Sequence, residues 1–200
     1  MKMFWTIGLA VVVVAVAAAA LWASKAFSAS MQRAAGESAA SVYDLQVRTL
    51  AGEAVSLEQY RGQVALVVNT ASKCGLTPQY EGLEALWREM RDEGLVILGF
   101  PSNDFMNQEP GDAEQIRRFC TENYDVTFPL FEKVHVKGDQ KSALYRVLTA
   151  ELDEPSWNFT KYLVGTDGRV VARFGPRTAP DHPRLRHAIE RQLGLAGPAE

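Results

Sequence analysis

Two stretches of the chain are continuously apolar and rich in β-branched residues, "VALVVNT" at 64–70 and "LVILGF" at 95–100. Runs of this length and composition are typical of strands that are buried on both faces. Between them, apolar residues recur at i, i+3, i+4 and i+7, which places them on one face of a helix: Leu83, Leu86, Trp87 and Met90. The pattern predicts a βαβ unit whose two strands are parallel.

The start of that helix is marked by Thr77 and Pro78. Threonine is a favoured N-cap, and proline is favoured at the first helical position because its missing N–H needs no partner there. We therefore expect Thr77 to cap the helix and Pro78 to be its first residue.

Shorter patterns predict the remaining elements. They are two short strands around Ala51-Gly52, a capped turn with Ser56 and Gln59, a helix opened by Asp112 with Gln115 at capping-box spacing, an extended "FPLFEKVHV", a helix in "KSALYRVLTAEL", a hairpin around Asp167-Gly168 and a last helix in "PRLRHAIERQL". This order predicts an α/β protein with a mixed central β-sheet flanked by helices, close to the thioredoxin-like fold.

The N-terminus contains an uncharged apolar run, Met3–Ser24. It is long enough to span a hydrocarbon core of about 30 Å. It indicates a secretory signal or an uncleaved membrane anchor. Both alternatives predict export to the periplasm or cell envelope, and the second adds attachment to the inner membrane. The expected plan is a signal or anchor at 1–25, a flexible tether at 26–41, one folded domain at 42–195 and a tail at 196–200.

Composition excludes several classes of protein. The 200 residues are 47% hydrophobic and carry a formal net charge of −3, so nothing points to nucleic acid. Two cysteines are too few for a disulfide-stapled scaffold, and with three scattered histidines they disfavour a structural zinc site. We expect neither a metal nor a bound cofactor.

The candidate chemistry lies in "NTASKCGLTP", which joins the first buried strand to its helix. Cys74 precedes the helix N-terminus, where unpaired N–H groups favour an anion, and Lys73 adds a positive charge. A reactive thiolate is one interpretation, and a small buried thiol is the other. Thr77 stands where a C-x-x-C pair would have its second cysteine, which argues against an exported thioredoxin-like thiol–disulfide oxidoreductase. Leu76 and Pro78 stand where a copper-delivery domain would need its second thiol, which argues against that alternative as well.

Four segments in order resemble the glutathione peroxidase family: "VNTASKCGLTPQYEGLEAL", "LGFPSNDFMNQEPG", "FPLFEKVHVKG" and "WNFTKYLVGTDGRVVARF". Together they extend over the folded part of the chain. The resemblance implies a thioredoxin-like fold, reduction of hydrogen peroxide and organic hydroperoxides, and a role in oxidative-stress defence. The second segment departs from "FPCNQF", which many members carry, because Ser102 replaces a cysteine and Asp104 replaces a glutamine. The absence of the insertion found in tetrameric members favours a monomer.

The same resemblance assigns roles to four residues of this chain. Cys74 matches the peroxidatic position, Gln108 the family's catalytic glutamine, and Trp157 and Asn158 its tryptophan and asparagine. The physical chemistry agrees, because the two amides and the indole N–H are hydrogen-bond donors that would stabilise a thiolate and orient a peroxide.

The second cysteine, Cys120, falls on the apolar face expected for its helix, together with Ala113, Ile116 and Phe119. A buried structural thiol is therefore one interpretation. The resemblance implies another, because thioredoxin-dependent members have a resolving cysteine at about this place. That role would require local unfolding near Gly111–Tyr124. It favours a thioredoxin-like reductant over glutathione, although Lys73, Arg173 and Arg177 are candidate glutathione contacts.

Overall fold

The computed structural model describes residues 41–196 of the chain. The predicted signal or anchor at 1–25 and nearly all of the predicted tether lie outside these residues. Within 41–196, no helix is both long and apolar enough to cross a membrane.

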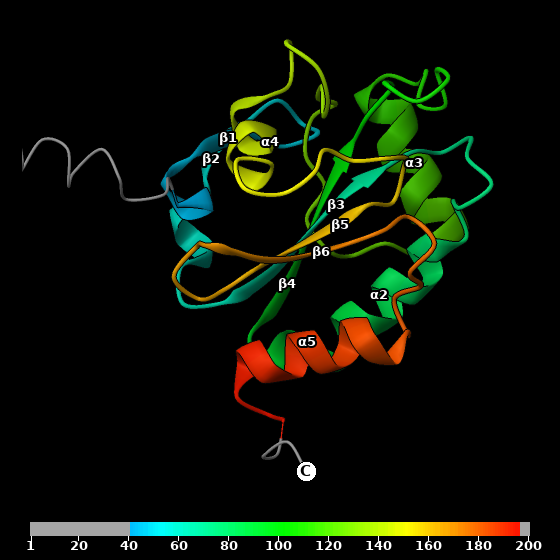
Figure 1. Ribbon diagram of the computed structural model, residues 1–200. Coiled ribbons are helices and arrows are strands. Elements are labelled where there is room, and N and C mark those ends of the chain that lie inside the picture. The colour runs from blue at the N-terminus through cyan, green and yellow to red at the C-terminus, as the bar shows by residue number, and fades with distance from the viewer. Residues whose placement is uncertain (1–40, 197–200) are drawn as a thin grey trace, which may run out of the picture. The chain divides into compact units, whose positions relative to one another are not determined.

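A four-stranded sheet forms the centre of the fold, in the order β4-β3-β5-β6 (Figure 1). Its strands are β3 (Val64–Thr70), β4 (Leu95–Pro101), β5 (Lys161–Val164) and β6 (Val170–Phe174). β3 and β4 are parallel, as the predicted βαβ unit requires, whereas β5 is antiparallel to both β3 and β6. The sheet is therefore mixed. A separate hairpin, β1 (Gln46–Arg48) with β2 (Ala54–Ser56), confirms the two short strands predicted near the start of the domain.

Helices cover both faces of the sheet. They are α2 (Gln79–Met90), α3 (Ala113–Tyr124), α4 (Ala143–Leu148) and α5 (Pro183–Leu193). Because side chains alternate along β3, Leu66 and Val68 pack in the cluster that contains buried residues of α2, α3 and α5. Ala65 and Val67 pack in the opposite cluster, which contains α4. Burial on both faces explains why β3 and β4 have no polar alternation.

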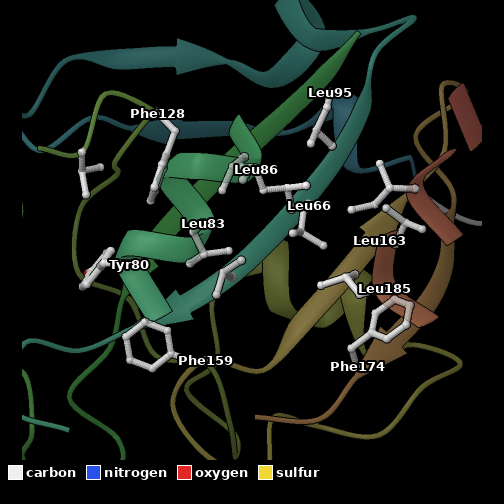
Figure 2. Close-up of a cluster of buried hydrophobic side chains, with 14 of the residues drawn as sticks. Leu66, Tyr80, Leu83, Leu86, Leu95, Phe128, Phe159, Leu163, Phe174 and Leu185 are labelled. Atoms are coloured by element: carbon white, nitrogen blue, oxygen red, sulfur yellow. The ribbon is translucent and has the colours of Figure 1, made fainter. Parts of the chain in front are cut away.

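The larger core cluster holds the site-bearing helix in place. Leu83 and Leu86 of α2 point toward Leu66 of β3, and Leu163 of β5 and Leu185 of α5 belong to the same cluster (Figure 2). Full burial of one such leucine contributes about 1.5–3 kcal/mol relative to exposure. The cluster therefore fixes the position of α2, whose N-terminal end carries the cysteine loop.

The helix α2 begins one residue later than predicted, and the predicted capping contact of Thr77 is also wrong. Pro78 is the N-cap, without a side-chain hydrogen bond, and the helix begins at Gln79. The Thr77 hydroxyl instead bonds within the preceding loop, donating to Ala71 O and accepting from Cys74 N. The loop uses that hydroxyl because its own buried amide and carbonyl need partners.

The other helix signals are confirmed, with one exception on α3. Asp112 and Gln115 form the predicted capping box, and Gly194 ends α5 in the left-handed conformation. Ala113, which was expected on the apolar face, is exposed because it lies in the first turn, outside the contact between α3 and the core. The extended segment after α3 forms no strand and contributes only isolated bridges at Leu130 and Phe131.

Candidate active site

Cys74 lies in the turn that follows β3, and its side chain is buried, with 8% of the residue exposed. The Leu76 backbone N–H donates to Cys74 Sγ at 3.4 Å. Cys74 N in turn donates to Thr77 Oγ1 at 3.0 Å. Thr77, at the position where a C-x-x-C motif has its second thiol, thus stabilises the loop. One backbone N–H group, that of Leu76, donates to the sulfur.

Gln108 and Asn158 are brought together from distant parts of the sequence. Asn158 Nδ2 donates to Gln108 Oε1 at 3.0 Å, and Asn158 is fully buried. The Lys73 N–H donates to the backbone oxygen of Gln108 at 2.9 Å. This second bond ties the Gln108 loop to the residue that precedes the cysteine.

The loop that presents Gln108 has unusual backbone geometry. Met106 and Asn107 both have φ of 53°, in the left-handed region that non-glycine residues rarely adopt. Asn103 Oδ1 accepts from Glu109 N at 2.8 Å, and Asn103 Nδ2 donates to Asn107 Oδ1 at 3.2 Å. Side-chain bonds therefore hold the loop in a conformation that costs backbone energy, a pattern common at functional sites.

A cavity of about 780 Å³ opens beside the cysteine. Its lining comes from residues 74–76, from Ser156 and Trp157, and from 175–178 together with His182. The Trp157 ring lies 5.4 Å from the Phe105 ring, between centroids. Cys74 and Trp157 therefore share one cavity, whereas Gln108 and Asn158 are not among its lining residues. All four predicted residues gather at this end of the sheet.

Asn69, the penultimate residue of β3, holds the Trp157–Asn158 segment in place. Its Nδ2 donates to Trp157 O at 3.1 Å, its Oδ1 accepts from Thr160 N at 3.1 Å, and its backbone oxygen accepts from Phe159 N at 2.6 Å. Asn69 was not among the residues predicted from the sequence. The available signal was an amide near the end of a run of apolar residues, "VALVVNT", and the structure shows that this amide is fully buried.

Glu109 is a second residue that the sequence analysis did not single out. Its side chain is fully buried, and Oε1 accepts from Ser72 Oγ beside the cysteine loop. Oε2 has no hydrogen-bond partner among the described residues. Burial raises the pKa of this carboxyl, opposed by the Ser72 bond and by Lys133 and Lys73. Glu109 thus anchors the Gln108 loop to the cysteine loop.

Cys120 lies on α3, fully buried in the same apolar cluster as Cys74, and both thiols are free. Burial raises the pKa of the Cys120 thiol to about 11, and the charge of Glu109 acts in the same direction, whereas the Tyr80 hydroxyl nearby opposes the shift. While α3 is folded, Cys120 is therefore a protonated core thiol at neutral pH. The fold is consistent with both interpretations of this residue, a structural thiol and a resolving thiol that must first be exposed.

The two departures from the family pattern have local explanations. Ser102 is fully buried, and its hydroxyl oxygen accepts from Asp104 N at 3.4 Å. The Asp104 carboxylate accepts from Val136 N at 2.7 Å and lies 2.7 Å from His135 Nδ1. Asp104 therefore fastens the Gln108 loop to the extended segment after α3. Among residues 41–196, no cluster of three or more metal-binding side chains occurs.

Comparison with known proteins agrees with this geometry. The sequence model of the glutathione peroxidase family matches residues 42–149, more than half of the chain. The chain belongs to this family. The glutathione peroxidase homolog BsaA of Halalkalibacterium halodurans is 49% identical over 145 residues, which cover 70% of this chain and 92% of that protein. The hydroperoxy fatty acid reductase Gpx2 of Synechocystis is 51% identical over 146 residues, covering 73% and 95%.

A solved structure shows the same relationship. The crystal structure of Trgpx in its apo form superposes with a TM-score of 0.65 at 37% identity, covering 80% of this chain and 100% of that chain. This glutathione peroxidase family protein therefore has a thioredoxin-like fold and is a thiol peroxidase, an oxidoreductase with peroxide as acceptor. The family acts on hydroperoxides and draws electrons from thiol reductants rather than from a prosthetic group. The thiol–disulfide oxidoreductase alternative is not favoured.

Proposed function

We propose that Cys74 is the peroxidatic residue, assisted by Gln108, Trp157 and Asn158. The observation that carries this assignment is a cysteine that lines a cavity with Trp157 and receives a backbone N–H on its sulfur. The Asn158–Gln108 bond supports the roles of the two amides, because it engages Gln108 Oε1 and leaves the Gln108 amide N–H groups available as donors.

The chemistry follows from these groups. The Cys74 thiolate attacks one oxygen of the hydroperoxide, so that an S–O bond forms while the O–O bond breaks. The sulfur loses two electrons and becomes a sulfenic acid. The departing oxygen takes a proton and leaves as water or an alcohol. Donors around the sulfur stabilise the thiolate before attack and the charge that develops on the departing oxygen.

Cys120 is the proposed resolving residue. Its thiolate attacks the sulfenic sulfur of Cys74, an S–S bond forms, and hydroxide leaves and is protonated to water. A dithiol then reduces the disulfide by two exchange steps and is itself oxidised. Because Cys120 is fully buried and its pKa is raised, α3 must open locally before this step. We propose that the segment 111–124 opens.

The C-terminal end of α3 is held by a polar clamp centred on Glu84 of α2. Glu84 accepts from Thr127 N at 2.7 Å and from Arg88 Nε at 2.6 Å. Arg88 continues to the Asp125 carboxylate at 2.7 Å. Asp125 caps α3 in the left-handed conformation, and its N–H bonds to Cys120 O. The clamp therefore fixes the C-terminal end of 111–124, the segment that is proposed to open.

We propose a thioredoxin-like donor, with glutathione as the second candidate. The presence of Cys120 supports the first, since a disulfide suits a dithiol reductant. Exposed Lys73 and Arg177 beside the site support glutathione. Arg173, the third candidate contact, donates to Glu154 O at 3.0 Å and is not among the residues that line the cavity. Fatty-acid hydroperoxides are proposed substrates beside hydrogen peroxide, on the basis of the Synechocystis relative's name.

The test is steady-state turnover of cumene hydroperoxide with thioredoxin or glutathione, in wild type, Cys74→Ser and Cys120→Ser. We expect Cys74→Ser to abolish reduction with both donors. Cys120→Ser should keep one fast peroxide reduction per molecule but lose thioredoxin-dependent turnover. Full activity of Cys74→Ser would contradict the peroxidatic assignment. Unchanged thioredoxin kinetics of Cys120→Ser would make Cys120 structural.

Export remains part of the proposal, and the apolar run Met3–Ser24 supports it. The protein would act as a monomer in the periplasm or cell envelope, free or anchored to the inner membrane, and would need an exported thiol reductant. Mass spectrometry of the mature protein after cell fractionation tests this. A chain starting at residue 1 in the soluble cytoplasmic fraction would contradict export.

A further inference from the structure

Lys161, the first residue of β5, is a fully buried lysine. Its Nζ donates to Thr178 O at 2.7 Å, to Pro176 O at 3.4 Å and to the side-chain oxygen of Gln79. All three partners are neutral. Burial without a compensating carboxylate lowers the pKa of Lys161 to about 7. A buried ammonium of this kind costs free energy, so stability does not explain why it is there.

The three partners of Lys161 belong to two segments beside the active-site cavity. Pro176 and Thr178 line the cavity, as Cys74 does. Gln79 is the first residue of α2, directly after the cysteine loop, and its Nε2 donates to Pro176 O at 2.7 Å. Lys161 itself follows shortly after Trp157, which also lines the cavity. One ammonium group therefore connects three parts of the site.

The segment 175–178 continues along α2 before it enters α5, as the orange part of the chain shows in Figure 1. A Cβ atom added at Gly82 would lie 3.1 Å from the Pro180 ring, so helix and segment are in close contact there. Pro180 follows the segment by two residues. The segment itself is linked to the start of α2 by the Lys161 bonds to Thr178 O, Pro176 O and the Gln79 side chain, and by the Gln79 bond to Pro176 O.

We propose that Lys161 is a positioning residue of the peroxidase reaction, which holds the segment 175–178 against α2 and so sets the width of the cavity beside Cys74. The inference rests on the proposed role of Cys74. Hydrogen peroxide is small and needs only the sulfur and its nearby donors. An organic hydroperoxide must also place its apolar part against 175–178. Lys161 therefore governs which hydroperoxides reach the sulfur in a productive orientation.

The experiment compares rate constants for oxidation of Cys74 by hydrogen peroxide and by cumene hydroperoxide, in single-turnover measurements on the full chain. Lys161→Met removes the ammonium at similar volume. Lys141→Met is the matched control, because Lys141 is a partly buried lysine bonded to Glu154 at 2.7 Å and lies outside the cavity lining. A purely structural role would alter both rate constants together.

We expect Lys161→Met to lower the cumene hydroperoxide rate constant about tenfold more than the hydrogen peroxide rate constant, which is less than the about 10²-fold cost of a displacement of about 1 Å in a positioning contact. Lys141→Met should leave the ratio unchanged. Gln79→Leu removes the side-chain oxygen that accepts from Lys161 and the donor to Pro176 O, and should shift the ratio in the same direction. It provides the measurement if Lys161→Met does not fold.

An unchanged ratio in folded Lys161→Met would overturn the positioning role. If Lys161→Met does not fold, an unchanged ratio in Gln79→Leu overturns it. Both results presuppose a wild type that reduces hydrogen peroxide through Cys74. A wild type without Cys74-dependent reduction would instead overturn the proposed function, so the two failures are distinguishable.

Discussion

The Asn158 side-chain amide donates to Gln108 Oε1 across 3.0 Å, joining the residue after Trp157 to the loop after β4. The bond fixes which end of the Gln108 amide is free. With Oε1 engaged, the Nε2 hydrogens are the ones that remain to donate toward a reacting sulfur or oxygen.

Asn158→Asp should therefore lower the rate constant for Cys74 oxidation more than Asn158→Ala does. A carboxylate in place of the amide repels Gln108 Oε1 and turns the Gln108 N–H groups toward itself. Loss of one oriented donor costs about 10²-fold or more in comparable sites. Stopped-flow oxidation by hydrogen peroxide measures the effect. Equal rate constants in the two variants would show that the orientation of Gln108 does not matter.

Asn69→Leu should destabilise the fold by about 2–3 kcal/mol, because Thr160 N and Trp157 O lose their buried partners. Urea unfolding of the variant against wild type gives the difference. Asn123→Leu is the control, since Asn123 is exposed on α3 and bonds only to Phe119 O. A cost for Asn69→Leu no greater than the control's would contradict the proposed anchoring role.

Glu84→Gln should speed alkylation of Cys120 in a Cys74→Ser background. The neutral amide loses charge-assisted bonds to Arg88 and Thr127, which weakens the clamp on the end of α3 by about 1–3 kcal/mol and raises the opened fraction about tenfold or more. Glu89→Gln is the control, because Glu89 lies on α2 as Glu84 does and its exposed ion pair is with Arg186 of α5. Equal alkylation rates in the two variants would show that the clamp does not control the opening of α3.

The burial of Lys161 should also make the free energy of unfolding depend on pH. Its pKa falls from the ordinary 10.5 to about 7 on folding, because of burial. Between these values the unfolded chain holds a proton that the folded chain lacks, so the stability of wild type relative to Lys161→Met should rise with pH. The slope approaches about 1.4 kcal/mol per pH unit in this window, and is flat below it.

Urea unfolding of wild type and Lys161→Met at about pH 6, 8 and 9.5 measures this difference and cancels groups that titrate in both proteins. A difference that stays constant over the whole range would mean that the buried amine keeps an ordinary pKa.

The periodic parts of the fold were predictable because a single sequence carries their signal. β3, β4 and the apolar face of α2 follow from burial on both faces and from helical spacing. The capping box of α3 follows from side chains that bond a few residues away. These features depend on local physics, and the structure confirms them.

Residues that connect distant segments were harder to predict from the sequence. Lys161 sits in a strand sequence where a lysine normally indicates a solvent-facing position, and only its three partners from other elements explain its burial. Thr77 has the right residue type for an N-cap, yet the loop before it competes for the same hydroxyl. The family resemblance supplied Gln108, Trp157 and Asn158, but nothing in their own sequence pattern predicted the Asn69 contacts that hold them.

Only 8% of Cys74 is exposed, and the residue lines a cavity that a molecule the size of a peroxide can enter. A thioredoxin-like reductant, the donor proposed above, carries its thiol on a protein surface too bulky for that cavity. Under the proposed mechanism such a reductant would therefore act after α3 has opened and Cys120 has reached Cys74. Peroxide and this kind of reductant would then not compete for the same place on the protein.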